Sequence, residues 1–515
     1  MFTGERYQLT FNGSFNGNEN LEEVPAGEYA NGSRNINQHN GGAEKRGGTQ
    51  KVGSQITSSL KSLGGGVLVK RSSGTIHTYW AGDNGALYRN GSSIQTGRST
   101  TAKTHFSAID DKMFICNGVA SVQVDTGSSV AAITTAAADW TSTTHPKKIM
   151  LHSKGASRRA FAWGVPGKES TLYYSALGAF ETFSGSTSGT VVIDFEDGYG
   201  IVDCVSKDGT LWIFGRSETY ILDDASTDVA TWGYTAASFK GGVHSPRLVK
   251  VVNNHIYAMN TQGDVYEVIT AEQLRDYEQA SITEPFFIHN YIRSEIDLTR
   301  IDDFHMEYEP RTKALAIFMV RTGQTQVDTC IKYFVNQNKW SPPHDAQDNP
   351  SQSGYKAAAS YLIQTSTGTK KLYTQDYNGF TWELESTAKT DDGQAYKSET
   401  YSGSLDFDLE GEEKRYPFAQ LHYRSRGDYS LNVVWFVNEV QQATRSFSLA
   451  STGASLGTFI LDTDTLSVVG PNIKEFEMGQ IGDSVRISVN NSGAGHDFFI
   501  SSIVFPFVRR GVQRQ

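Results

Sequence analysis

The sequence predicts an all-β protein: a β-propeller, which is a ring of four-stranded sheets called blades, with a second antiparallel β domain. Two observations predict this class. Gly, Ser and Thr make up more than a quarter of the 515 residues, and 8 Trp, 24 Tyr and 27 Phe add many aromatic side chains. Turn formers and aromatics are typical of β proteins, and this aromatic content excludes a disordered chain. Short apolar runs also alternate with hairpin-turn signals over most of the chain.

Residues 1–60 are polar and rich in Asn and Gly, with little hydrophobic periodicity. A segment of this composition cannot bury enough apolar surface to fold alone. We therefore expect an extended segment that packs on the second β domain or on a neighbouring subunit.

Residues 61–395 carry the pattern that indicates the propeller. An aromatic residue is followed six positions later by Gly, and three positions after that by a second aromatic. The pattern occurs as Tyr79, Gly85 and Tyr88, as Tyr257, Gly263 and Tyr266, and as Tyr373, Gly379 and Trp382. A hairpin whose two strands each present an aromatic side chain explains it.

The spacing of the turn glycines predicts the number of blades. Gly209, Gly263, Gly323 and Gly379 lie 54, 60 and 56 residues apart, which suits a four-stranded repeat. The interval from Gly85 to Gly209 is about twice as long, so a turn near Gly155 or Gly167 would fill it. We expect about six blades, the alternative being unrelated hairpins in one or two sandwiches.

Helical signals are few. Thr270 and Gln273 resemble a capping box for a short helix through Leu274 and Tyr277. The segment 55–63 is the second candidate. Neither could form a layer of helices.

Residues 396–515 predict a separate β-sandwich or platform domain. Apolar residues alternate with others from Leu431 to Val437 and from Val485 to Val489, and residues 498–507 form another apolar strand. The acidic stretch 406–413 precedes these strands and is interpreted as a solvated edge or loop.

Charge and cysteine content exclude several classes of function. The net charge is −10, without the basic excess of a general nucleic-acid binder or a membrane-directed basic face. Arg509, Arg510 and Arg514 are interpreted as a solvated tail. We expect no signal peptide, no membrane insertion, and synthesis in a reducing cytoplasm. The three cysteines, Cys116, Cys204 and Cys330, are far apart and lie in different segments, which argues against a disulfide framework or a zinc site. Cys116 and Cys204 lie in apolar runs, so they are interpreted as buried small hydrophobic side chains.

No motif predicts a catalytic, cofactor or metal site, and we expect a protein that is not an enzyme. Residues 64–70 have the glycines and lysine of a phosphate loop at the wrong spacing. Gly453, Ser455 and Gly457 match a nucleophile elbow, but a strand follows where a helix is needed, which favours a hairpin loop. Residues 206–212 are similar to the Asp-box turn of sialidase propellers, with Asp and Gly adjacent instead of one residue apart.

Four possible metal ligands lie on one face of a predicted strand: Asp303, His305, Glu307 and Glu309. Phe304, Met306 and Tyr308 lie on its other face. An amphipathic strand with a wet polar face explains all seven residues, so this interpretation is favoured over a metal site.

Three segments resemble the head-to-tail nozzle proteins of short-tailed bacteriophages, a family also called tail tubular protein B or DNA-stabilisation protein. The first, residues 42–52, has a Gly-Ala, a basic pair and a Gly-Thr, with Gly47 where the family usually has Pro. The second, residues 331–341, resembles the family's strand, turn and Trp-Ser segment. The third is the pair of strands at residues 485–489 and 498–511.

The resemblance implies a virion protein made in the host cytoplasm. It implies a propeller with a β platform, and a hexameric ring below the portal and its adaptor proteins that carries fibres or a needle. The ring would enclose the DNA channel, and its charge of about −60, six times −10, would let DNA pass without specific binding. Two alternatives stay open: a carbohydrate-binding or depolymerising propeller of a phage tail, and a tail hub or baseplate component.

Overall fold

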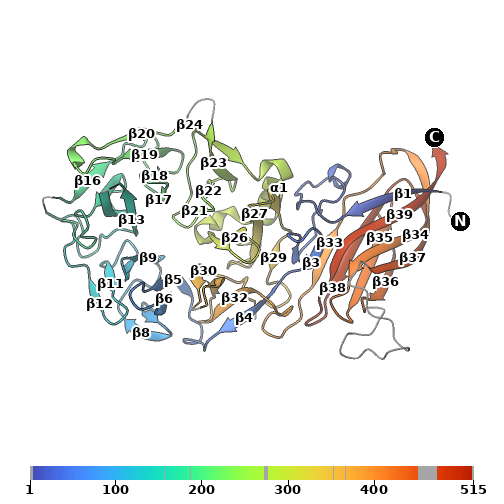
Figure 1. Cartoon of the computed structure of the whole chain (residues 1–515), viewed down its shortest axis with the longest axis horizontal. Coiled ribbons are helices and arrows are strands. Elements are labelled where there is room, and N and C mark those ends of the chain that lie inside the picture. Colours follow the sequence, from blue (N-terminus) through green and yellow to red (C-terminus); the bar gives the residue numbers. More distant parts are fainter. Residues whose placement is uncertain are drawn as a thin grey trace.

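The computed structural model describes residues 4–512, except residues 156, 186, 272–275, 352, 366 and 451–471. Figure 1 shows a ring of sheets beside a compact pair of longer-stranded sheets, with both chain ends at the far end of that pair. The prediction of an all-β protein with a propeller is confirmed by the sheet topology.

Within the described residues, seven antiparallel sheets form the propeller. The first three blades are β5 (Ser62–Val69), β6 (Ile76–Gly82), β7 (Leu87–Arg89) and β8 (Ser92–Gln95); β9 (His105–Ile109), β10 (Lys112–Cys116), β11 (Gln123–Asp125) and β12 (Val130–Ala132); and β13 (Lys148–Lys154), β14 (Ser157–Trp163), β15 (Thr171–Tyr174) and β16 (Gly189–Val192).

The fourth and fifth blades are β17 (Asp203–Lys207), β18 (Thr210–Phe214), β19 (Thr219–Asp223) and β20 (Gly233–Ala236); and β21 (Val249–Val252), β22 (His255–Met259), β23 (Val265–Ala271) and β24 (Asp276–Ser281). The sixth has five strands, β25 (His305–Glu309), β26 (Ala314–Met319), β27 (Thr329–Phe334), β28 (Lys339–Trp340) and β29 (His344–Asp345). The seventh has β30 (Ala359–Gln364), β31 (Lys370–Gln375), β32 (Thr381–Ser386) and β4 (Gly48–Val52).

The first strand of each blade lines the axis of the ring. Contacts run from β5 to β9, β13, β17, β21, β25 and β30, and from β30 back to β5. The recurring aromatic–Gly–aromatic pattern marks the hairpin between the second and third strands of a blade, as in β6–β7, β22–β23 and β31–β32. The ring is therefore closed on itself.

The ring has seven blades where the glycine spacing predicted about six. The error lies between Gly85 and Gly209, an interval that contains the whole second and third blades. Gly209 lies in the hairpin between β17 and β18, the first two strands of the fourth blade. Gly85 lies between β6 and β7, the second and third strands of the first blade. Gly85 and Gly209 therefore mark hairpins at different positions within their blades, so the interval between them does not give a number of whole blades. Gly118, after β10, lies in the blade that the spacing missed.

An N-terminal strand completes the seventh blade. β4 pairs antiparallel with β32, with Val52 opposite Thr381 and Lys51 opposite Trp382. The expected propeller range of 61–395 leaves this strand out. Since the chain enters the ring at β4 and leaves it at β32, the two ends of the propeller are hydrogen-bonded to each other.

A two-sheet sandwich, called the platform below, contains the rest of the strands. One sheet has the order β2 (Ile36–Asn37), β3 (Ala43–Lys45), β39 (Phe499–Val512), β34 (Glu412–Arg424) and β37 (Asn472–Gly482), with β1 (Glu5–Thr10) also paired to β39. The other has the order β33 (Ser398–Tyr401), β38 (Val485–Asn491), β35 (Ser430–Val437) and β36 (Val440–Ser448). The N-terminal segment thus supplies strands to the platform as well as to the propeller.

Helix is scarce in the described residues: α1 (Ile288–Glu295) and 3₁₀ turns η1 (Leu21–Glu23), η2 (Val229–Thr231), η3 (Glu284–Phe286) and η4 (Leu298–Asp303). The predicted helix from Thr270 is wrong, because Thr270 in β23 pairs with Tyr277 in β24. Gln273 and Leu274 lie outside the described residues. Residues 56–59 form bends and turns instead of the second candidate helix, and β5 begins at Ser62.

One apolar core joins the two parts of the molecule. It contains Phe15 and Tyr29 from the N-terminal segment, Phe318 and Trp340 from the sixth blade, and platform residues such as Trp435. The three cysteines are free and buried, which confirms the prediction of burial for Cys116 and Cys204. The propeller and the platform are therefore packed against each other through shared core side chains.

A substitution at Gly64 tests how closely the strands pack at the ring axis. A Cβ atom at this position would lie 1.9 Å from the main-chain oxygen of Thr104. We expect Gly64→Ala to lower the free energy of unfolding by about 1–3 kcal/mol, because backbone must move to relieve the clash. Gly233→Ala is the matched control, since nothing lies within 4 Å of its Cβ position. Urea unfolding of both variants measures the difference, and equal stability would contradict the packing described.

Candidate functional site

The four residues proposed as possible metal ligands do not converge. Asp303 ends η4 and pairs with Lys103 Nζ at 2.6 Å, and Glu307 pairs with Lys250 Nζ at 2.8 Å. Glu309 accepts hydrogen bonds from the main-chain N–H groups of the following turn. Among the described residues, no group of three or more His, Cys, Asp or Glu side chains is placed to hold a metal ion.

The expectation of a wet polar face on this strand is wrong. His305, Glu307 and Glu309 are all buried. β25 is the innermost strand of its blade, so both of its faces are covered by neighbouring blades. The polar residues of this alternation are therefore buried with protein partners, such as Lys250 for Glu307 and main-chain N–H groups for Glu309.

The other sequence motifs lie in structural positions. Gly64, Gly65 and Gly66 are part of strand β5 and not of a phosphate loop. Asp208 and Gly209 form the turn of the β17–β18 hairpin, where Asp208 has a φ of 51°. The segment from Gly453 to Gly457 lies outside the described residues.

The first of the three segments that carry the family resemblance pairs with the third and shares a binding partner, Glu385, with the second. Ala43 and Glu44 in β3 pair with Ile500 and Phe499 of the last strand. The main-chain N–H of Gly47 donates to Glu385 Oε2 at 2.7 Å. Lys332, in the second segment, donates through Nζ to Glu385 Oε1. Segments that lie far apart in the sequence therefore share one set of contacts.

We call this set the joint and define it by five buried residues: Arg46, Lys332, His344, Glu385 and Asp391. Glu385 is 2% exposed and lies at its centre. Besides Lys332 and Gly47, the Glu385 carboxylate accepts hydrogen bonds from Tyr355 Oη at 2.8 Å and Asn37 Nδ2 at 3.0 Å. Burial raises the pKa of Glu385, but the positive charge of Lys332 and the contact with His344 outweigh it and hold this pKa well below its usual value.

The backbone of Glu385 is also unusual. Its φ of 53° lies in the left-handed region, which L-residues rarely adopt. The pairing of β32 with β4 shifts register between Glu383 and Ser386, so Glu385 occupies a bulge. The bulge turns a charged side chain from the sheet into the joint, and such strain costs on the order of 1–3 kcal/mol.

Arg46 and Asp391 form the second half of the joint. Two guanidinium nitrogens of Arg46 donate to the two Asp391 oxygens at 2.9 and 2.8 Å, and Nε donates to Asn35 Oδ1 at 2.8 Å. The guanidinium lies 3.7 Å from the ring centroid of Tyr396. Arg46 has no exposed surface. A planar, bidentate pair of this kind fixes the relative orientation of the guanidinium and the carboxylate as well as the distance between them.

Lys45 reaches from the same segment into the platform. Its Nζ lies 3.3 Å from Asn491 Oδ1 and 3.0 Å from the Gly493 carbonyl oxygen. Burial, with the neighbouring charge of Arg46, lowers the pKa of Lys45 to about 7. The basic pair of the first segment is thus divided, because Arg46 binds the propeller side and Lys45 binds the platform side.

His344 makes the joint sensitive to acid. Burial and Lys332 lower the pKa of His344 to about 4, against 6.5 for an exposed histidine. The unfolded chain therefore binds a proton here between pH 6.5 and pH 4, and the folded chain does not. The stability contributed by this residue is complete above pH 6.5 and falls, by about 3 kcal/mol in total, as the pH drops to about 4.

The variant His344→Gln should lose less stability than the wild type between pH 7 and pH 4.5. Asp203, whose pKa burial raises to about 6, has the opposite effect in both proteins and cancels in the comparison. Urea unfolding at the two pH values measures the difference. Equal pH dependence in both proteins would contradict a neutral, buried His344.

Sequence reasoning did not identify Glu385, Asp391 or His344. Arg46 and Asp391, for example, are 345 residues apart, so no local pattern marks either partner. One signal was available, since Arg46 and Gly47 belong to the segment that resembles the nozzle family. None of the helices in the described part of the chain is long and apolar enough to cross a membrane.

No protein-family model and no curated protein sequence matches the chain. Several solved structures are similar to it at TM-scores below 0.4. The extracellular domain of a putative one-component system from B. thetaiotaomicron has a TM-score of 0.37 and 10% identity over 68% of this chain and 41% of that one. The chain thus spans less than half of that protein.

Two further structures are similar in the same limited sense. An exo-β-1,3-galactanase from Phanerochaete chrysosporium has a TM-score of 0.26 and 9% identity, covering 81% of this chain and 97% of that one. The Neurospora crassa Pan2 WD40 domain has a TM-score of 0.39 and 10% identity, covering 66% and 95%.

Proposed function

We propose that this protein is a structural subunit of a short-tailed bacteriophage tail, acting by assembly and not by catalysis. Six copies would form the nozzle ring below the portal and adaptor proteins, hold the DNA channel and carry fibres or a needle. The observation that supports this role is the joint. Two of the three segments that resemble the nozzle family contribute Arg46 and Lys332 to it, and the third pairs with β3, directly before Arg46.

A ring subunit needs its parts held at a constant angle. In this chain the propeller and the platform share an apolar core, and buried hydrogen bonds link them across the joint, from Asn37 of β2 to Glu385 and between His344 and the Ile36 carbonyl of β2. A buried ion pair contributes little net stability, and we propose that the pairs Arg46–Asp391 and Lys332–Glu385 instead favour one geometry of this chain. The residues of the joint therefore suit a structural subunit that keeps one rigid shape within an assembly.

The net charge suits a channel through which DNA slides. The chain carries −10, and six copies carry about −60. An acidic lumen repels the phosphate backbone, whereas a basic lumen would bind it without sequence specificity. We propose that genomic DNA passes through the ring without specific contacts.

The mass of the assembled protein tests this proposal. Mass photometry over a concentration series, alone and with portal–adaptor complexes, is expected to give particles of six times the chain mass of 56.6 kDa. Particles of one chain mass under every condition, with no binding to the connector, would contradict the nozzle role.

A second candidate is a carbohydrate-binding or depolymerising propeller of a phage tail. The axial cavity of the ring, with a volume of about 560 Å³ and several charged side chains, favours it. Incubation with host surface polysaccharide discriminates the two roles. Release of new reducing ends would support a depolymerase and contradict a protein that acts by assembly alone.

A further inference from the structure

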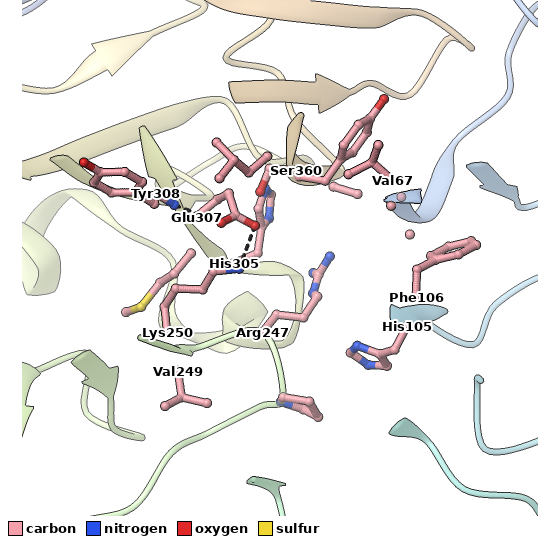
Figure 2. Close-up of a pocket in the computed structure, with 18 of the residues that line it drawn as sticks. Val67, His105, Phe106, Arg247, Val249, Lys250, His305, Glu307, Tyr308 and Ser360 are labelled. Atoms are coloured by element: carbon pink, nitrogen blue, oxygen red, sulfur yellow. Dashed lines mark hydrogen bonds and ion pairs between the residues drawn. The ribbon is translucent and has the colours of Figure 1, made fainter. Parts of the chain in front are cut away.

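The axial cavity lies where the innermost strands of the propeller converge. Residues from β5, β9, β21, β25 and β30 line it, and its volume is about 560 Å³. Figure 2 shows Arg247 pointing into the space between His305 on one side and Phe106 on the other. The three side chains come from three different parts of the ring.

Arg247 is a cation without a carboxylate partner in the part of the chain that the structure describes. Its Nη1 donates to the Ala358 carbonyl oxygen at 3.0 Å, and its Nη2 donates to the carbonyl oxygens of Asp303 at 2.7 Å and Asp302 at 3.3 Å. These bonds fix the guanidinium but use only three of its five N–H groups. Two N–H donors of the cation remain for a ligand.

Three lysines that face the same region are already paired. Lys148 Nζ lies 2.8 Å from Asp203, Lys250 Nζ lies 2.8 Å from Glu307, and Lys103 pairs with Asp303. Among the described residues that line the cavity, Arg247 and Lys370 are the cations without an ion pair, and Arg247 is the one held in place by main-chain carbonyl oxygens. Burial and the combined field of Lys148, Arg247, Lys147 and Lys103 hold the pKa of His105 well below its usual value.

His305 supplies a second polar group. It is 2% exposed, its ring stacks on Phe318 with centroids 4.7 Å apart, and its Nδ1 faces the Asp303 carbonyl oxygen at 3.5 Å. Its Nε2 is buried and has no hydrogen-bond partner among the described residues. With the proton on Nδ1, Nε2 is an acceptor that needs a donor such as a hydroxyl group.

Phe106 lies across the cavity from these two groups (Figure 2). Gly66 makes this position possible, because a Cβ atom there would lie 2.5 Å from Phe106 Cβ. A partly exposed aromatic ring in a cavity offers an apolar surface to the carbon face of a flat ligand.

We propose that the axial cavity binds a hydroxylated acid of the size of a sugar, with its anionic group on Arg247 and a hydroxyl group donating to His305 Nε2. The ring of the ligand packs on Phe106. A carboxylate, as in a uronic acid residue, and a phosphate, as in a phosphorylated sugar, share the chemistry that Arg247 recognises. The proposal deepens the second candidate function and rests on the propeller being a binding module, and it does not depend on ring assembly.

Isothermal titration calorimetry with three probes tests the site in the full-length protein. D-glucuronate and D-glucose 6-phosphate carry the acid, and D-glucose is the neutral control. We expect at least one of the two acids to bind about tenfold more tightly than glucose. The tighter acid identifies the class of ligand. Equal or absent binding of all three probes to the wild-type protein would overturn the proposal.

Two variants and one control assign the contacts. Arg247→Gln is expected to weaken binding of the preferred acid about tenfold or more, and His305→Phe, which keeps the stacking on Phe318, to weaken it several-fold. Arg300→Gln is the control, since Arg300 also donates to a main-chain carbonyl, that of Thr325, but does not line the cavity.

Circular dichroism and thermal unfolding confirm that each variant is folded. Unchanged affinity in a folded Arg247→Gln protein would overturn the assignment of the anion contact. If that variant does not fold, the wild-type preference for acid over glucose still decides the question. Acid binding without release of reducing ends would support the site and contradict a depolymerase.

Discussion

Replacing Glu385 with Gln is expected to lower the free energy of unfolding by about 3–5 kcal/mol. The side chain is 2% exposed, and its neighbours Lys332, Tyr355, Asn37 and the Gly47 N–H all direct donors at it. A Gln side chain has one acceptor oxygen and one NH₂ group, so donors would face donors on one side. Lys332, which has no exposed surface, would also lose its counter-ion.

Urea unfolding followed by tryptophan fluorescence measures this effect. Glu383→Gln is the matched control two residues earlier in the same strand. Glu383 pairs with Lys371 Nζ at 2.7 Å, and the Lys371 side chain is 29% exposed. We expect this change to cost less than about 1 kcal/mol. Similar losses for the two variants would contradict a central role for Glu385.

Asp391→Asn is expected to have an effect of the same size, about 3–5 kcal/mol. Asp391 receives two hydrogen bonds from Arg46 and two from the main-chain N–H and hydroxyl of Thr49. An Asn side chain keeps one acceptor and places an NH₂ group against the guanidinium. Arg46 would remain fully buried with its charge uncompensated.

The neighbouring residue provides the control for this pair. Asp392 binds Lys51 Nζ at 2.8 Å, and the two side chains are 30% and 26% exposed. We expect Asp392→Asn to change the free energy of unfolding by less than about 1 kcal/mol. A double variant of Asp391→Asn with Glu385→Gln further tests whether the two halves of the joint are coupled, since residues that act together give non-additive losses.

The hairpins of the propeller could be predicted from the sequence because their signals are local. Gly85, Gly263 and Gly379 each lie in the turn between two neighbouring strands, and each has a positive φ. Such turns depend on residues that are close together in the sequence. The number of blades was harder to predict, since Gly209 marks a hairpin at a different position within its blade.

The closure of the ring could not be predicted in this way. β4 lies in a polar, glycine-rich segment and pairs with β32, at the opposite end of the propeller sequence. Its strand conformation depends on that partner and not on its own composition. The same holds for the burial of Glu307, which alternates with apolar residues like a solvent-facing side chain but pairs with Lys250 of the neighbouring blade.

The joint was only partly visible in the sequence. The family resemblance directed attention to the segment with Lys45 and Arg46, without assigning either side chain a partner. The role of Asp391 and Glu385 can be recognised only in the folded chain, because their hydrogen-bond partners come from distant segments. These are the N-terminal segment, which supplies Arg46 and Gly47, and the sixth blade, which supplies Lys332. Polar residues with distant partners carry no periodic signal.

We propose above all that this chain is a structural subunit of a ring-shaped assembly. Electron microscopy of the purified protein, alone and on portal–adaptor complexes, tests it most directly. We expect class averages with six-fold symmetry in which every subunit shows the propeller and the platform at one constant angle. Single particles in which the two parts vary in angle, and which do not attach to the connector, would contradict the account.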